Sequence, residues 1–301
     1  MAKAIPPNKK EQVKKEPVKD FFKDVVFVLV AFFFLNSFVL ASFEVPTGSM
    51  ENEIMAGDFL FVNKFLYGGT TPRNIPFTNV RLPWFRVPAI RDVERGDVIV
   101  FEFPGQRDEV VSPEFMFYLK RAVALFGDTI EVVNRALYVN GRPAPIPRNM
   151  KFNDFTLKPK GMGEFNIFPS GAPYNEDNWG PMVVPKQGDI IPLSADNFEQ
   201  WRVFIGREGH KALLDAHGQV LIDGAPATTY TVQHNYLFGM GDNRDNSLDS
   251  RFWGFIPEEN IVGTPMIVYW SWSPDIPLLD LSSFPSKLAS IRFGRIGTLI
   301  K

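Results

Sequence analysis

Residues 97–103 read DVIVFEF, and residues 117–125 read FYLKRAVAL. Both runs are short and rich in β-branched and aromatic residues, which is the composition of β-strands. Turn signals bound them, with Arg95-Gly96 before the first run and Gly127-Asp128 after the second. Similar short runs occur at residues 59–62, 129–133, 137–139, 220–222 and 267–272. Since no long stretch beyond residue 43 shows sustained helical periodicity, we predict a mainly β fold, packed as sheets or as a partly open barrel.

The run VVFVLVAFFFLNSFVLASF at residues 25–43 contains no charged residue over 19 positions. A membrane-spanning helix needs roughly 20 apolar residues. A buried core helix and a cleavable signal peptide are the alternatives. A signal peptide has a shorter apolar region and a small-residue cleavage site, for which Ala41-Ser42-Phe43 is a poor match. Seven lysines precede the run and Glu44 follows it, so we predict a retained anchor with a cytoplasmic N-terminus and the rest of the chain outside.

The composition narrows the classes of function. A net charge of −2 argues against nucleic acid as the main partner, because phosphate binding needs a clustered positive surface. The absence of cysteine excludes disulfides, thiolate catalysis and zinc–sulfur sites. The nucleophile elbow, the HExxH metal motif and the phosphate loop are also missing from the sequence. A calcium loop starting at Asp245 would put Ser250 where glycine belongs and Ile256 where the bidentate glutamate belongs, so we predict no calcium site there.

Changes in composition divide the chain into segments. LYVNGRPA at residues 137–144 and VLIDGAPA at residues 220–227 each predict a β-hairpin, with an Asn-Gly or Asp-Gly turn. Residues 148–219 are richer in Pro, Gly, Asn and Lys and suggest an insertion. The predicted segments are a lysine-rich cytoplasmic tail at 1–24, the anchor at 25–43, a first part of the core at 44–147, a β-rich inserted subdomain at 148–230 and a return to the core at 231–301.

Four segments carry the motifs that indicate a function. They are VPTGSM at 45–50 with AGDFLFVNKF at 56–65, RGDVIVF at 95–101, YLKRAVALFGD at 118–128 and GMGDNRDNSLDSRFWG at 239–254. In this order they resemble bacterial type I signal peptidases, also called leader peptidases. Three positions depart from the family pattern: Thr47, where many members have serine, and Ala124 and Phe126, where glycine and proline are usual. The final residues 291–297 look like the family's closing strand.

The resemblance implies a serine peptidase with a Ser–Lys dyad, in which Ser49 is the nucleophile and Lys120 the general base. The chemistry of the residues agrees. Alternate residues of a strand share a face, so Lys120 lies with Tyr118 and Ala122 on an apolar face. An amine there loses solvation, its pKa falls, and the neutral form can accept the serine proton. Taken alone, Ser49 is a polar turn residue and Lys120 an edge-strand lysine, but the four motifs in order favour the dyad.

The resemblance also implies supporting residues. The backbone N–H of the nucleophile and the hydroxyl of Thr47 would form an oxyanion hole. Ser247 would hydrogen-bond the amine of the dyad lysine and hold it in place. Asp249 and Arg251 would pair and stiffen the loop that carries Ser247, although a surface ion pair in a turn is an alternative interpretation. No cofactor and no metal are expected.

The implied substrates are secreted preproteins delivered by the export machinery, cleaved after small residues of the Ala-x-Ala type. Such a peptide would bind as an extended strand. The implied location is the bacterial cytoplasmic (inner) membrane, crossed once, with the catalytic domain outside and the lipid bilayer as a partner. Aromatic residues at 84–85, 270 and 272 are candidates for a membrane-facing surface. Phe101 and Phe103 are instead predicted to lie in the core.

Three other interpretations compete with this one. A single-span β-domain that binds partners without catalysis explains the anchor and strands, but not why Ser49, Lys120 and the loop at 241–251 occur together. A self-cleaving or dedicated processing peptidase would use the same dyad on one substrate. A Ser-His-Asp protease would use His234, which the family's mechanism does not require and which we expect to be an ordinary loop residue.

Overall fold

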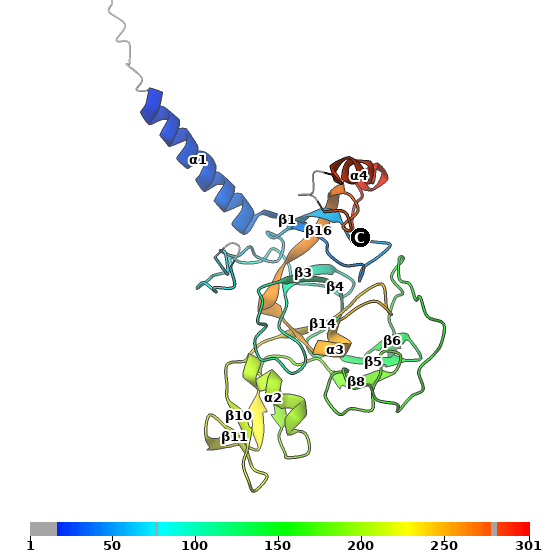
Figure 1. Ribbon diagram of the computed structural model, residues 1–301. Helices are drawn as coiled ribbons and strands as arrows, with labels where there is room; N and C mark the ends of the chain where they lie inside the picture. The colour runs from blue at the N-terminus through cyan, green and yellow to red at the C-terminus, as the bar shows by residue number, and fades with distance from the viewer. Residues whose placement is uncertain (1–16, 76–77, 278–281) are drawn as a thin grey trace, which may run out of the picture.

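The computed structural model describes residues 17–75, 78–277 and 282–301 and is mainly β, as predicted (Figure 1). A seven-stranded antiparallel sheet forms its centre, in the order β1-β2-β16-β3-β4-β14-β15. Its strands are β1 (Leu40–Glu44), β2 (Asp58–Asn63), β16 (Ile261–Ser271), β3 (Val98–Glu102), β4 (Phe117–Leu125), β14 (Tyr236–Met240) and β15 (Ile256–Pro257). Register shifts interrupt the pairing of β16 with both β2 and β3. Such bulges bend a strand, and the bent β16 curls the sheet into the partly open form that the sequence predicts.

A four-stranded sheet packs beside the central one. It consists of β7 (Arg142–Pro143), β6 (Ala136–Val139), β5 (Thr129–Val133) and β8 (Trp179–Val183), in that order. The β6–β7 hairpin has the predicted turn, with positive φ at Asn140 and Gly141, as a type I′ turn requires. Because β8 pairs with β5, this sheet crosses the predicted boundary at residue 148.

The rest of the predicted insertion contains small elements. They are β9 (Ile190–Pro192), α2 (Phe198–Arg207), β10 (Ala212–Leu214), β11 (Val220–Ile222), β12 (Ala225–Pro226) and β13 (Thr229–Thr231). The second predicted hairpin is confirmed as β11–β12, with Asp223 and Gly224 at positive φ. Helix α2 was not predicted from the sequence, and it buries Phe198, Val203 and Phe204.

The apolar run at residues 25–43 divides between two elements. Helix α1 (Pro17–Phe38) contains most of it and extends away from the sheets (Figure 1). Among the described residues it is the one helix long and apolar enough to cross a membrane. The helix ends at Phe38 because the chain then pairs with β2, where Leu40 opposes Asn63. The last residues of the predicted span therefore form a strand, which is a correction to the expected anchor.

The C-terminal segment also differs from the expectation. Residues 291–297 contain a 3₁₀ turn (Phe293–Arg295) in place of a closing strand. The segment still runs beside β16, since the Gly297 N–H donates to Val268 O at 2.8 Å. The arginines at 292 and 295 turn inward to Ser271 and Asp58, and these contacts are incompatible with a flat strand edge. The remaining helical elements are α3 (Ser250–Trp253), a 3₁₀ turn (Glu258–Asn260) and α4 (Phe284–Ala289).

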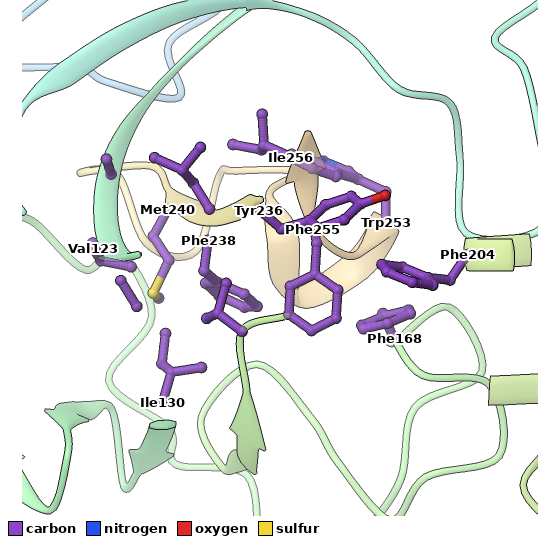
Figure 2. Close-up of a cluster of buried hydrophobic side chains, with 14 of the residues drawn as sticks. Val123, Ile130, Phe168, Phe204, Tyr236, Phe238, Met240, Trp253, Phe255 and Ile256 are labelled. Atoms are coloured by element: carbon purple, nitrogen blue, oxygen red, sulfur yellow. The ribbon is translucent and has the colours of Figure 1, made fainter. Parts of the chain in front are cut away.

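The larger apolar core joins the two sheets and α2. Figure 2 shows Tyr236 and Phe238 of β14 among Phe255, Trp253 and Phe204. Each buried aromatic ring removes a large apolar area from water, so this cluster holds β14 firmly. Phe101 and Phe103 are 0% and 3% exposed, which confirms their predicted place in the core. Since β14 leads directly into residues 241–251, the core fixes the start of that loop.

Candidate active site

Ser49 lies in the turn between β1 and β2 and is buried. The turn begins where the Val45 N–H donates to Asp58 O at 2.9 Å. Val45 and Met50 insert into a second apolar cluster under the sheet, and they are 7% and 1% exposed. Two apolar anchors therefore flank the serine on the chain and fix its position.

Lys120 lies in β4, opposite Ile99 of β3. Its side chain is 3% exposed, and its amine donates to Ser49 Oγ at 2.8 Å and to the Leu119 carbonyl at 3.0 Å. The Tyr118 ring lies 5.4 Å from the amine, on the face that strand alternation predicts. The structure thus brings together the two residues that the sequence analysis singled out, 71 positions apart.

The environment of Lys120 weakens its hold on a proton. Burial lowers the pKa of the amine from 10.5 to about 8, because a buried ammonium loses its hydration. The charge of Asp249 opposes this shift, and the charge of Arg251 adds to it. A substantial fraction of the amine is therefore neutral at mildly alkaline pH and can accept a proton.

The loop after β14 is built around the predicted pair of Asp249 and Arg251. Their side chains are 2.8 Å apart and almost fully buried. Asp249 also accepts from the Gly241 N–H at 3.1 Å and from the Arg251 N–H, where it caps α3. Arg251 further donates to the Arg244 and Glu176 carbonyls. The pair is confirmed, and its alternative interpretation as a surface ion pair is wrong.

Ser247 is close to the dyad, but it does not make the predicted hydrogen bond to Lys120 in this structure. Its hydroxyl is buried and has no partner among the described residues. Gly241 is responsible for this close packing. A Cβ built on Gly241 would lie 2.2 Å from Ser247 Oγ and 2.5 Å from Ser49 O, so only glycine fits between the two serines.

Two further contacts join the loop to the dyad, and neither was predicted from the sequence. Arg121, next to Lys120, forms a buried forked ion pair with Asp242 at 2.6 Å. The Asn243 N–H donates to Ser49 O at 3.0 Å, and its side chain donates to Gly48 O at 3.0 Å. These residues lie inside quoted motifs, but no pattern in the sequence shows that they meet.

A cavity of about 490 Å³ opens at the dyad. Thr47 is exposed on its wall. Apolar side chains at the end of β1 and the start of β4 also line it, including Phe43, Phe117 and Leu119. None of the three histidines lines this cavity. No group of three or more His, Cys, Asp or Glu residues suited to a metal occurs in the part of the chain that the structure describes.

A buried lysine amine in contact with a serine hydroxyl is a known variant of the serine-hydrolase site, so the site has the side chains that a serine hydrolase needs. The chain belongs to the family "Signal peptidase, peptidase S26", which matches residues 18–270. It is therefore a peptidase.

Curated relatives agree with this family. The chain is 30% identical to signal peptidase I of Pseudomonas aeruginosa, over 91% of this chain and 80% of that protein. It is 30% identical to signal peptidase I of Haemophilus influenzae, over 98% and 80%. A solved signal peptidase I from Enterococcus faecalis covers 58% of this chain and 98% of its own at 19% identity, with a TM-score of 0.29, which is too low to support a comparison of folds.

Proposed function

We propose that this chain is a membrane-bound serine endopeptidase that removes N-terminal signal peptides from exported preproteins. The observation that carries the proposal is the 2.8 Å contact between the Lys120 amine and Ser49 Oγ in a buried site. The family match and the signal peptidase I relatives support the substrate class. The apolar side chains on the cavity wall, among them Phe43, Phe117 and Leu119, support an extended peptide as the substrate. Cleavage after small residues, as in an Ala-x-Ala site, is proposed from the resemblance of the motifs.

The proposed reaction uses two proton transfers by one amine. Neutral Lys120 removes the proton from Ser49 Oγ as the oxygen attacks the scissile carbonyl carbon. Collapse of the tetrahedral intermediate breaks the C–N bond, and Lys120 returns the proton to the leaving amine. An ester to Ser49 remains. Water then attacks this ester with Lys120 as base, which releases the new carboxylate and restores the serine.

The remaining predicted residues have supporting parts in this proposal. The Ser49 N–H has no acceptor among the described residues, and with the Thr47 hydroxyl it would stabilise the oxyanion, each donor being worth roughly 3 kcal/mol. Asp249 and Arg251 hold the loop against the dyad. Ser247 lies at the dyad with a free hydroxyl and would bind the amine once a substrate displaces the Lys120 contact with Ser49.

The membrane attachment rests on α1. Its apolar side chains are exposed along the helix, and the chain passes from Phe38 through β1 to Ser49. Only β1 and a turn separate the helix from the site in the sequence, so we place the site at the membrane face where a signal peptide emerges. With the lysine-rich N-terminus in the cytoplasm, the catalytic domain would lie on the outer face of the bacterial cytoplasmic membrane.

The first test compares wild type with Ser49→Ala on a preprotein that has an Ala-x-Ala site, in detergent. We expect wild type to make a single cut after the second alanine and Ser49→Ala to lose at least about 10⁴-fold in kcat. His234→Ala is the control and should cleave normally. If well-folded wild type does not cut several unrelated preproteins, the chain is a binding domain or a dedicated processing peptidase.

The pH profile is a second prediction. Because burial lowers the pKa of Lys120 to about 8, and only the neutral amine accepts a proton, kcat/KM should rise with pH up to about 8 and then level off. Below that pKa it should fall about tenfold for each pH unit. The measurement is initial cleavage rate from pH 5 to pH 10 with a fixed peptide. An optimum below pH 6 would contradict Lys120 as the base.

A further inference from the structure

A second cavity, of about 520 Å³, shares no lining residue with the one at the dyad. Arginine side chains contribute its charge, namely Arg95, Arg121, Arg142 and Arg244. Its other walls are mainly apolar, with Val123 of β4, Leu137 and Val139 of β6, and the prolines of residues 143–147. It is therefore a cationic cavity with one apolar wall.

Arg244 is the unusual member of this group. It is 3% exposed, and its Nε has no hydrogen-bond partner. No carboxylate of the described residues forms an ion pair with it. Burial lowers the pKa of its guanidinium to about 10, and the nearby charge of Arg251 adds to this effect. A buried cation without an ion-pair partner is costly. An anion from outside the chain would supply that partner to Arg244.

The neighbouring carboxylates do not fill that need. Asp242 is held by Arg121, and Asp249 is held by Arg251. Both carboxylates act on Arg244 through their charge and raise its pKa, but each is paired with another arginine, so Arg244 has no carboxylate of its own. At the rim of the cavity, Arg95 is bound to Asp128. Arg142 is exposed and has no ion-pair partner in the described part of the chain, which adds a second uncompensated charge.

We propose that this cavity binds a soluble phosphate monoester, whose doubly charged phosphate is held by Arg244 and Arg142. Guanidinium groups bind phosphate in a forked geometry with charge-assisted hydrogen bonds. The organic part of the ligand would lie on Leu137, Val139 and the proline-rich segment. Figure 1 shows α1 at the β1 end of the central sheet and β6 near its β14 end. With α1 in the membrane, as proposed above, the cavity lies away from the bilayer, so we infer a ligand from solution and not a lipid headgroup.

The cavity also has a physical connection to the dyad. Arg121 lies on its wall and follows Lys120 in β4, while the Arg244 carbonyl accepts from Arg251 at 2.8 Å. An anion that neutralises Arg244 therefore removes a repulsion from the Asp249–Arg251 pair. We expect occupancy to stabilise the loop at 241–251.

The test is isothermal titration of the full chain in neutral detergent with phenyl phosphate, with inorganic phosphate and with micelles containing phosphatidic acid. We expect phenyl phosphate to bind more tightly than inorganic phosphate, and Arg244→Gln and Arg142→Gln each to weaken it at least about tenfold. Arg148→Gln is the matched control, since Arg148 is exposed near the cavity but does not line it; it should bind like wild type.

Several outcomes would overturn the proposal. The first is that wild type does not bind phenyl phosphate, and the second is that Arg148→Gln loses as much affinity as the two cavity variants. The third is that Arg142→Gln keeps the wild-type affinity. Arg142→Gln tests the site even if Arg244→Gln disturbs the loop. If phosphatidic acid binds and phenyl phosphate does not, the ligand is a lipid headgroup and the proposed soluble ligand is wrong. Because the measurement is binding, its result is independent of whether the chain cleaves preproteins.

Discussion

Replacing Lys120 with methionine should abolish cleavage and at the same time stabilise the folded protein. Loss of the general base should lower kcat by about 10⁴-fold or more, since base and nucleophile act as one unit. Methionine nearly preserves the volume of the buried side chain, so the β4 packing remains. Cleavage of a preprotein and thermal unfolding of the same sample measure the two effects.

The gain in stability follows from the pKa of the amine. Burial lowers this pKa from 10.5 to about 8, so the unfolded chain holds the proton more tightly than the folded chain. Stability then rises with pH between about 8 and 10.5, and the full cost of burying the charge, roughly 3 kcal/mol, applies at pH 7. Methionine removes that cost, so Tm at pH 7 should rise by several degrees.

The control for the stability measurement is the same comparison at a higher pH. Near pH 10.5 the wild-type amine is neutral in the folded protein and the cost is small, so the difference in Tm between Lys120→Met and wild type should shrink. A variant that cleaves at a near-normal rate would remove Lys120 from the mechanism. A variant that loses stability at pH 7 would show that the amine contributes favourable contacts larger than its desolvation.

The sheet could be predicted because its strands carry their own signal. The runs at 97–103 and 117–125 are β-branched and bounded by turn residues, and they form β3 and β4. The failures occur where local pattern and tertiary contacts disagree. Residues 40–43 are as apolar as the helix before them, and only their pairing with β2 makes them a strand. Helix α2 is short, so its periodicity spans too few turns to be recognised.

The site, like the fold, could be predicted in part from the sequence. Ser49 and Lys120 could be named because they lie in motifs with a known order, and strand alternation placed Lys120 on an apolar face. The ion pair of Arg121 with Asp242 could not be found, because it joins residues 121 positions apart and depends on the register of β4 with β14. The absence of the Ser247 hydrogen bond is a matter of side-chain conformation, which sequence does not determine.

The second large effect is expected at the buried pair. Arg251→Met leaves the buried carboxylate of Asp249 without its ion-pair partner, and it removes the hydrogen bonds to the Arg244 and Glu176 carbonyls. Breaking a buried pair from one side costs about 3–5 kcal/mol. We therefore expect a clear fall in Tm together with lost cleavage, because the loop at 241–251 loses the ion pair and hydrogen bonds that hold it beside the dyad.

Two controls show whether this loss belongs to the pair. Arg202→Met breaks the exposed ion pair with Glu199 and should cost less than about 1 kcal/mol. The double variant Asp249→Asn with Arg251→Met removes both charges, so it should be more stable than Arg251→Met alone. If Arg251→Met unfolds at the same temperature as Arg202→Met, the pair does not stabilise the loop. If the double variant recovers stability but not cleavage, the hydrogen bonds of Arg251 to the Arg244 and Glu176 carbonyls position the loop for catalysis.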